Sequence, residues 1–187
     1  MDCTMKKNNS KKQHHTLNFL FTPDYVFPTF SAITPEFLIS HNIKALVIDV
    51  DNTLAPYEQE LPDQRTIEWF KNLADNGIKA ALISNNKPER IEKYNAPLGL
   101  PAYPDSKKPS TKTILLAIKQ MGVTVEETAG LGDQLLTDTW AVHRLNMPSL
   151  IVPPIKDKKT PFFKVKRLIE KPFMKRYYKH RHEVNQK

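Results

Sequence analysis

A short apolar run that ends in two aspartates, at residues 45–54, constrains the fold of this chain more than any other feature. The run reads ALVIDVDNTL; it is rich in β-branched residues and continuously apolar before the first aspartate, which is typical of a strand buried on both faces of a sheet. Because side chains alternate along a strand, Asp49 and Asp51 are predicted to emerge on the same side at its end. Two buried carboxylates repel each other, so the pair favours a hard cation such as Mg²⁺, or phosphate chemistry that brings one.

The aspartate pair taken alone has two other interpretations. It could lie in a solvated turn, because a D-x-D pattern is short and matches by chance. Asp49, Asp51 and Glu60 also hold the first, third and twelfth positions of a calcium loop. However, Leu54 stands where that loop needs glycine, and a strand-like run replaces the helix that precedes it, so a calcium loop is disfavoured.

Apolar runs and helical patterns alternate along the 187 residues, a length that suits one domain with a sizeable core. Beyond the first strand, further strands are predicted at residues 79–84, 100–103, 127–131 and 149–152. Helices are predicted at residues 62–76, 88–94, 111–121 and 137–146, with an earlier one from Thr34 to about Asn42. Residues 19–33 are predicted to be an extended segment that packs on the domain. The alternation predicts an α/β fold, a parallel sheet with helices on both faces.

Polar clusters stand at the ends of the predicted strands or in the loops that follow them. Parallel sheets bind ligands at the carboxyl ends of their strands, so these clusters are expected to meet in one crevice. The clusters are Asp49 with Asp51, Ser84 with Asn85, Lys107 with Lys108, and Asp133 with Asp138.

In order, these clusters resemble the four motifs of the haloacid dehalogenase (HAD) superfamily of phosphotransferases, with Lys108-Pro109 as in its subclass III. The first motif is DVDNTL at residues 49–54, and the fourth is GDQLLTD at residues 132–138. The DVDNTL form, the triplet SNN, the Lys-Pro pair and the lead-in PDYV at residues 23–26 narrow the resemblance to the YqeG family. That family is related to the mitochondrial phosphatidylglycerophosphate phosphatases.

The resemblance implies an HAD-like Rossmannoid sheet and a role for each catalytic residue. Asp49 is the expected nucleophile, which forms an aspartyl-phosphate. Asp51 is the expected acid and base, which protonates the leaving oxygen and then deprotonates the attacking water. Lys108 is expected to neutralise charge on the nucleophile and the phosphoryl group.

The resemblance also implies substrate contacts and a Mg²⁺ site. Ser84 is expected to donate a hydrogen bond to a phosphoryl oxygen. Asn85 and Thr53 are further candidates for binding the substrate. Mg²⁺ is expected to bridge the nucleophile and the phosphate, because their negative charges repel. Its candidate ligands are Asp49, the main-chain carbonyl of Asp51, and Asp133. Asp138 is a further candidate, which either binds the ion directly or contacts one of its ligands.

Several of these residues also have ordinary structural interpretations. Ser84 could be a strand-end cap, and Lys107 competes with Lys108, which is preferred because Pro109 completes the motif. His143 is interpreted as a surface or packing residue. Three basic residues in and just before the predicted helix at 88–94 are interpreted as a solvated face: Lys87, Arg90 and Lys93.

The spacing between the motifs leaves no room for a cap domain. Residues 54–79 hold only a loop and one helix, and residues 84–108 are too few for a domain. The site is therefore expected to be open, which suits a bulky substrate with a projecting phosphate, such as a lipid head group, a nucleic-acid end or a phosphoprotein.

Charge divides the chain into a basic N-terminus at residues 1–16, predicted to be disordered, an HAD-like domain at 17–155, and a basic tail at 156–187. The net charges of the ends are +3 and +9, whereas the part between them carries −4. Basic ends indicate an anionic partner, either nucleic acid or an anionic membrane surface. In the tail, Pro172 is expected to separate two short amphipathic pieces, which either pack on the domain or lie on an anionic bilayer.

Other features bear on the compartment. Cys3 is the only cysteine, which fits a reducing cytosol. No apolar run reaches the roughly 18 residues of a transmembrane helix, and no signal-length apolar segment follows the basic N-terminus. We therefore expect a cytoplasmic protein, with peripheral contact to a membrane as a further expectation.

Three functional hypotheses remain from the sequence. The first is a Mg²⁺-dependent phosphomonoesterase that forms an aspartyl-phosphate, with a phosphatidylglycerophosphate-like lipid as its substrate. The second has the same chemistry but acts on polynucleotide ends or a nucleotide. The third is a basic RNA- or ribosome-binding module on an HAD scaffold, against which the intact set Asp49, Asp51, Lys108 and Asp133 argues.

Overall fold

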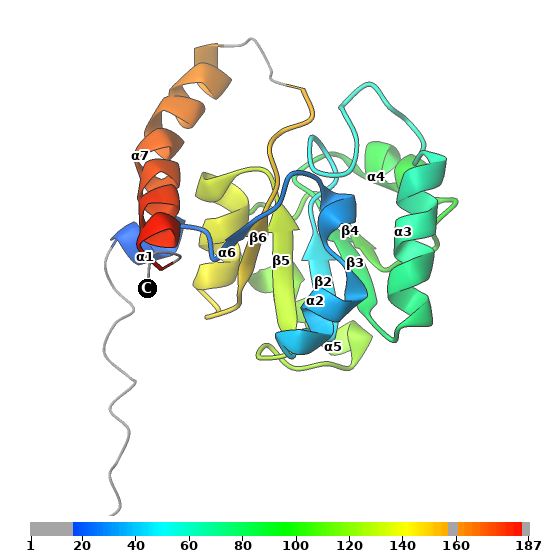
Figure 1. Cartoon of the computed structure of the whole chain (residues 1–187). Coiled ribbons are helices and arrows are strands. Elements are labelled where there is room, and N and C mark those ends of the chain that lie inside the picture. Colours follow the sequence, from blue (N-terminus) through cyan, green and yellow to red (C-terminus); the bar gives the residue numbers. More distant parts are fainter. Residues whose placement is uncertain (1–16, 157–160, 185–187) are drawn as a thin grey trace, which may run out of the picture.

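Six parallel strands form one open sheet in the order β1-β6-β5-β2-β3-β4 (Figure 1). The computed structural model describes residues 17–156 and 161–184, so the predicted disordered segment at 1–16 lies outside the described residues. The strands are β1 (Tyr25–Val26), β2 (Ala45–Ile48), β3 (Lys79–Ile83), β4 (Ala102–Tyr103), β5 (Thr128–Gly132) and β6 (Ser149–Ile151). The helices are α1 (Leu17–Phe21), α2 (Pro35–Ser40), α3 (Gln64–Asp75), α4 (Pro88–Asn95), α5 (Lys112–Met121), α6 (Trp140–His143) and α7 (Pro161–Val184), with the short helical turns η1 (Phe30–Ala32) and η2 (Leu135–Thr139).

Helices cover both faces of the sheet, and each face has its own core. Leu46 and Ile48 of β2 pack in a cluster with apolar residues of α2, α3 and α4. Ala45 and Val47, which point the other way, pack with α5 and α6. This double covering explains why the strand before Asp49 is continuously apolar, and the α/β fold with helices on both faces is confirmed.

The N-terminal segment differs from the prediction. Residues 19–33 were expected to be extended, whereas they hold the end of α1, then β1, then η1. β1 pairs with β6 and extends the sheet at its edge, with Tyr25 opposite Leu150. The sheet therefore has six strands instead of the five that were predicted, because a two-residue edge strand leaves almost no pattern in the sequence. The predicted helix at 137–146 is also divided, into η2 and α6.

No cap domain interrupts the described part of the chain between the motifs. β2 is followed by a loop and α3, and β3 is followed by α4, β4 and the loop to α5. None of the described helices combines the length and the apolarity that crossing a bilayer requires.

Helix α7 lies against α1 and η2 and is continuous through Pro172, so the expected division into two pieces is wrong (Figure 1). Contacts made by residues that follow the proline hold the helix to the domain. Phe173 packs on Phe21, with ring centroids 5.3 Å apart, and the Tyr177 hydroxyl accepts a hydrogen bond of 3.1 Å from the Val26 amide. These contacts offset the cost of a proline inside a helix, which is about 3 kcal/mol. Residues 157–160 and 185–187 of the predicted tail lie outside the described residues.

Candidate active site

Asp49 and Asp51 lie at the carboxyl end of β2, beside the end of β5. The Asp49 amide continues the sheet by donating to the Leu131 carbonyl at 2.9 Å. A tight turn follows, in which Asn52 takes a positive φ of 67° and its amide donates to the Ala55 carbonyl at 2.7 Å. This turn reverses the chain directly after the aspartates, and both side chains remain more than nine-tenths buried at the sheet edge.

Lys108 is the cation of the site. Its Nζ lies 2.7 Å from Asp49 Oδ1 and 2.7 Å from Asp138 Oδ1, and its side chain is 6% exposed. The neighbouring Lys107 is exposed, so the geometry favours Lys108 over its competitor. A buried ammonium group between two carboxylates balances part of the negative charge that these strand ends gather.

Asn85 holds the loop that carries Lys108. Its Oδ1 accepts hydrogen bonds from Ser106 Oγ at 2.9 Å and from the Lys108 amide at 2.6 Å, and its Nδ2 donates to the Lys108 carbonyl at 3.1 Å. The side chain also lines the cavity at the site. In this structure Asn85 therefore positions Lys108, and its predicted contact with substrate stays a prediction.

Thr53 and Ser84 make different contacts in the site. The Thr53 hydroxyl is buried and donates to Asp49 Oδ2 at 3.4 Å, so it contacts the nucleophile. Ser84 lines the cavity, and its Oγ accepts a hydrogen bond from the Asn86 amide at 3.0 Å. Ser84 thus faces the same cavity as Asp49 and Lys108, and the substrate roles of Ser84 and Thr53 stay predictions.

Asp51 is held by two side chains that the sequence did not single out as site residues. Asn86 Nδ2 donates to Asp51 Oδ2 at 2.9 Å, and the Arg90 guanidinium lies 3.3 Å from Asp51 Oδ1. The same guanidinium stacks over the Tyr94 ring, 5.1 Å from its centroid. The interpretation of Arg90 as part of a solvated face is therefore wrong.

The spacing on α4 is the signal that could have revealed Arg90. Residues four apart share a helix face, and Tyr94 is fully buried, so Arg90 must lie on the inner side of the helix. Lys87 and Lys93 are exposed, as predicted, and Lys93 pairs with Glu60 on the surface.

Three carboxylates form the group that fits a metal ion. One oxygen of each of Asp49, Asp133 and Asp138 lies within 4.8 Å of the others, and all three residues are buried. Buried carboxylates at this spacing are costly without a cation, and an all-oxygen donor set suits a hard ion such as Mg²⁺. The Asp51 carboxylate is engaged by Asn86 and Arg90 instead, which leaves its main-chain carbonyl as the predicted ligand.

A single π-helical turn, η2, carries Asp138, and two features fix it. A Cβ at Gly132 would overlap the Asp138 side chain, so only glycine permits this close approach. Asp138 Oδ2 in turn accepts a hydrogen bond of 3.1 Å from the Gln134 amide. The glycine of the fourth motif thus has a steric reason.

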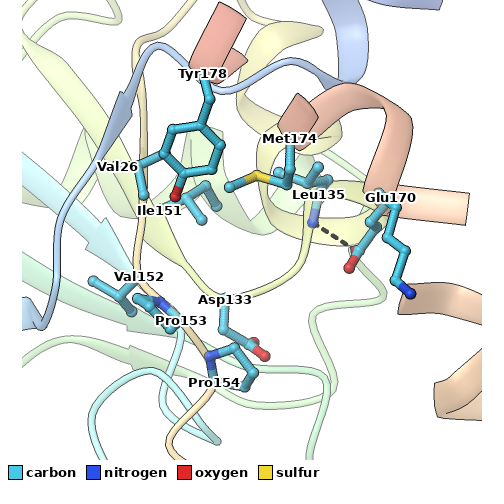
Figure 2. Close-up of a pocket in the computed structure, with 11 residues that line it drawn as sticks. Val26, Asp133, Leu135, Ile151, Val152, Pro153, Pro154, Glu170, Met174 and Tyr178 are labelled. Atoms are coloured by element: carbon cyan, nitrogen blue, oxygen red, sulfur yellow. Dashed lines mark hydrogen bonds between the residues drawn. The ribbon is translucent and has the colours of Figure 1, made fainter. Parts of the chain in front are cut away.

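Glu170 of α7 also holds η2, and nothing in the sequence pattern pointed to it. Its Oε1 accepts hydrogen bonds from the Leu135 amide at 2.8 Å and from the Leu136 amide at 3.4 Å (Figure 2). The glutamate is 3% exposed. Helix α7 therefore supports the turn that bears Asp138, one of the three clustered carboxylates.

Burial and neighbouring charges shift the pKa values of the central groups. Burial raises the pKa of Asp49 to about 8 in the metal-free protein; Lys108 opposes this, and Asp138 and Asp133 add to it. Burial alone would lower the pKa of Lys108, but Asp138 and Asp49 outweigh it and raise that pKa above its ordinary value. Burial likewise raises the pKa of the Tyr57 phenol at the cavity wall, and the aspartates reinforce it. Lys108 is therefore charged at neutral pH.

His143 lies outside this site and has a packing role, as one of the sequence interpretations held. Its ring stacks on Phe19, and its Nε2 lies 2.8 Å from Asp24 Oδ2. Asp24 also accepts a hydrogen bond from the Ser149 amide at 2.8 Å. Burial alone would raise the pKa of Asp24, but the hydrogen bond and charge of His143 and the bonds from Ser149 hold it below its ordinary value. This cluster fastens the N-terminal segment to β6.

The fold and this site define a hydrolase of the HAD type. Residues 57–145 match the family model of haloacid dehalogenase-like hydrolases. The chain belongs to this family and is an enzyme. It is 34% identical over 139 residues to the "Probable phosphatase YqeG" of Bacillus subtilis (strain 168), a match that covers 74% of this chain and 81% of that protein.

Two solved structures share the fold at lower identity. A hypothetical protein from Xanthomonas campestris is 20% identical with a TM-score of 0.51, covering 65% of this chain and 73% of that one. An uncharacterized protein from Listeria monocytogenes serotype 4b is 14% identical with a TM-score of 0.50, covering 64% and 85%. At these identities the likeness shows the fold alone.

Proposed function

We propose that this protein is a Mg²⁺-dependent phosphomonoesterase that acts through an aspartyl-phosphate on Asp49. The observation that carries the proposal is the position of Lys108, whose ammonium group lies 2.7 Å from the nucleophile and from Asp138, beside three clustered carboxylates. A cation here stabilises charge on the phosphoryl oxygens as the nucleophile attacks.

Two displacements at phosphorus make up the reaction. An Asp49 oxygen attacks phosphorus, the bond to the leaving oxygen breaks, and Asp51 gives that oxygen a proton. Asp51 then takes a proton from water, the water oxygen attacks phosphorus, and the bond to Asp49 breaks to release phosphate. Because Asn86 and Arg90 hold both oxygens of Asp51, its carboxyl is fixed for these proton transfers.

Mg²⁺ would be held by Asp49, Asp133 and Asp138, the three carboxylates that lie together. When bound, it neutralises the repulsion between the Asp49 carboxylate and a phosphate dianion. Magnesium imposes near-octahedral geometry, whereas calcium takes more oxygens and could engage both oxygens of the nucleophile. The proposed enzyme therefore depends on magnesium and is inhibited by calcium.

The proposed substrate is a phosphorylated lipid, with phosphatidylglycerophosphate as the candidate that the sequence resemblance supplies. The open site supports a bulky substrate whose phosphate projects outward. Helix α7 adds support, because its described surface combines exposed apolar side chains with cations. The apolar ones are Val165, Leu168, Ile169 and Tyr178, and the cations are Lys171, Lys175, Arg176 and Lys179.

Such a surface fits a peripheral contact with an anionic bilayer. Aromatic and aliphatic side chains enter the head-group region, and each basic residue near it contributes about 1 kcal/mol at low salt. A nucleic acid would also attract the cations, but it gives the exposed aliphatic side chains nothing to bury in.

Phosphate release from matched substrates tests the proposal. The full-length protein is assayed with Mg²⁺ on an aryl phosphate, a short-chain phosphatidylglycerophosphate, a nucleotide and a 5′-phosphorylated oligonucleotide, with Asp49→Asn as the inactive control. The highest kcat/KM on the lipid supports the proposal. The highest kcat/KM on the oligonucleotide or the nucleotide refutes the lipid as substrate class and supports a nucleic-acid end or a nucleotide instead. If the Asp49→Asn variant still releases phosphate at the wild-type rate, the mechanism is refuted.

Co-sedimentation with phosphatidylglycerol vesicles tests the membrane contact. We expect the wild type to bind at low salt and to be released as salt rises, since the Debye length falls. The double variant Lys175→Glu, Lys179→Glu is expected to remain in the supernatant. Equal sedimentation of both proteins would exclude α7 as the contact.

A further inference from the structure

A cavity of about 400 Å³ lies beneath α7, next to the metal-binding carboxylates (Figure 2). Its volume falls in the range of small-molecule sites, which is about 300–1,000 Å³. Its walls are mostly apolar and come from strands β1 and β6, from η2, from the segment after β6, and from α7. They include Val26, Leu135, Ile151, Val152, Met174 and Tyr178.

One end of this cavity borders the candidate metal site at Asp133. Asp133 lines the cavity and is also one of the three clustered carboxylates, and Figure 2 shows its carboxylate beside Pro154 at that end. A second cavity of about 300 Å³, lined by Asp49, Ser84 and Lys108, lies on the other side of the same motif and is mostly polar. A polar space for a phosphate and an apolar space therefore meet at the fourth motif.

The charged groups at the apolar cavity do not oppose an apolar occupant. Glu170 directs its carboxylate to the Leu135 amide, as the dashed line in Figure 2 shows, and so supports the wall. Lys171 also lines the cavity and is exposed, so its ammonium group can stay in water. The cavity opens to solvent at Pro153, Lys171 and Tyr178, which are exposed, so a ligand can enter it from the surface.

We propose that this cavity binds the hydrocarbon chain of a phosphomonoester whose phosphate is held at Asp49, an inference that rests on the proposed phosphatase function. Helix α7 then has two tasks: it supports η2, the turn that carries Asp138, and it forms the roof over the hydrocarbon chain. Met174 extends across this roof toward Val26 and Ile151, which makes it the position where added bulk would fill the space (Figure 2).

Binding of alkylphosphonates to the full-length protein with Mg²⁺, measured by titration calorimetry, tests this. The carbon–phosphorus bond is not hydrolysed, so the measurement needs no turnover. Full burial of the four methylenes that separate ethylphosphonate from hexylphosphonate would lower the Kd about 200-fold. We expect at least a tenfold decrease, which corresponds to about two-fifths of that burial energy; a smaller decrease overturns the proposal.

Met174→Trp is the blocking variant, and Leu168→Trp is its matched control, because Leu168 is exposed on the same helix and does not line the cavity. Met174→Trp is expected to abolish the gain with chain length while it leaves the Kd of ethylphosphonate unchanged. Leu168→Trp is expected to keep the gain. If Met174→Trp loses ethylphosphonate binding as well, Met174→Phe provides the same test with less added volume. A gain that persists in the blocking variant places the chain elsewhere and refutes the proposal.

Hydrolysis separates the two sources of such a chain and separates this inference from the proposed function. Higher kcat/KM for dihexanoyl phosphatidic acid than for hexyl phosphate identifies a lipid chain, and equal values identify a single alkyl chain; both support the cavity. Chain-dependent binding without hydrolysis of either compound supports the cavity and refutes the phosphatase proposal.

Discussion

Removing the Glu170 carboxylate tests whether α7 stabilises η2, the turn that bears the candidate metal ligand Asp138. Glu170→Ala would leave the Leu135 amide without the acceptor that now lies at 2.8 Å, in a fully buried position. An unpaired buried amide costs about 1–3 kcal/mol, and the longer bond of 3.4 Å to Leu136 adds little. We therefore expect the free energy of unfolding to fall by about 2–3 kcal/mol.

Glu170→Gln separates the hydrogen bond from the charge. It keeps an acceptor oxygen but loses the charge that strengthens the bond, so we expect a loss of about 1 kcal/mol. Urea unfolding followed by circular dichroism measures both variants, with Glu126→Ala as the control because Glu126 is exposed and its replacement should change stability by less than about 0.5 kcal/mol.

The same variants should change the metal requirement. A residue that orients the turn beneath the ligands typically affects metal affinity by about 10–100-fold when it is lost. We expect Glu170→Ala to raise the half-maximal Mg²⁺ concentration by about tenfold, with partial rescue in Glu170→Gln. A Glu170→Ala protein with wild-type stability and the wild-type Mg²⁺ requirement would refute the reasoning.

Four further predictions follow from the same contacts. Asp49→Asn should lower turnover by about 10³-fold or more with the circular dichroism spectrum unchanged, and wild-type phosphate release would contradict the nucleophile assignment. Activity should be lost in EDTA, return with Mg²⁺, and be suppressed when Ca²⁺ is added; equal rates in the two metals would count against the site. Arg90→Ala should lower kcat by about 10–100-fold at unchanged KM, with partial recovery in Arg90→Lys and no effect in the exposed control Lys93→Ala, since Arg90 acts by positioning Asp51. The pKa of Asp24 is held below its ordinary value of 3.8, so above that pH its carboxylate should make the wild type more stable than Asp24→Asn. This difference in the free energy of unfolding should disappear as the pH falls through the lowered pKa. A difference in urea midpoint between the two proteins that does not change with pH would contradict this.

The sequence by itself determined the inner strands of the sheet and the candidate central groups, but not the edge strand β1. A buried strand that ends in Asp49 and Asp51 can be predicted from the sequence, because β-branched composition and the alternation of side chains along a strand are local properties. Lys108 and Asp138 are far apart along the chain, yet both stand in motifs that follow strands, and the rule for parallel sheets brings such residues together. The structure places both against Asp49, with Lys108 as the bridge.

Only the tertiary structure decided which side chains support this centre. Arg90 is surrounded in the sequence by other charged residues, which suggested a solvated helix face. It pairs with Asp51 because α4 directs the face that carries Arg90 toward the site. Asn85 and Thr53 bond to the Lys108 loop and to Asp49 in this structure, a choice that depends on distances no pattern encodes. Glu170 lies 35 residues from Leu135, and Pro172 suggested a broken helix, yet α7 is continuous and buries that carboxylate on η2. Such contacts depend on how separate elements pack, whereas helix and strand patterns record only which face of each element is apolar.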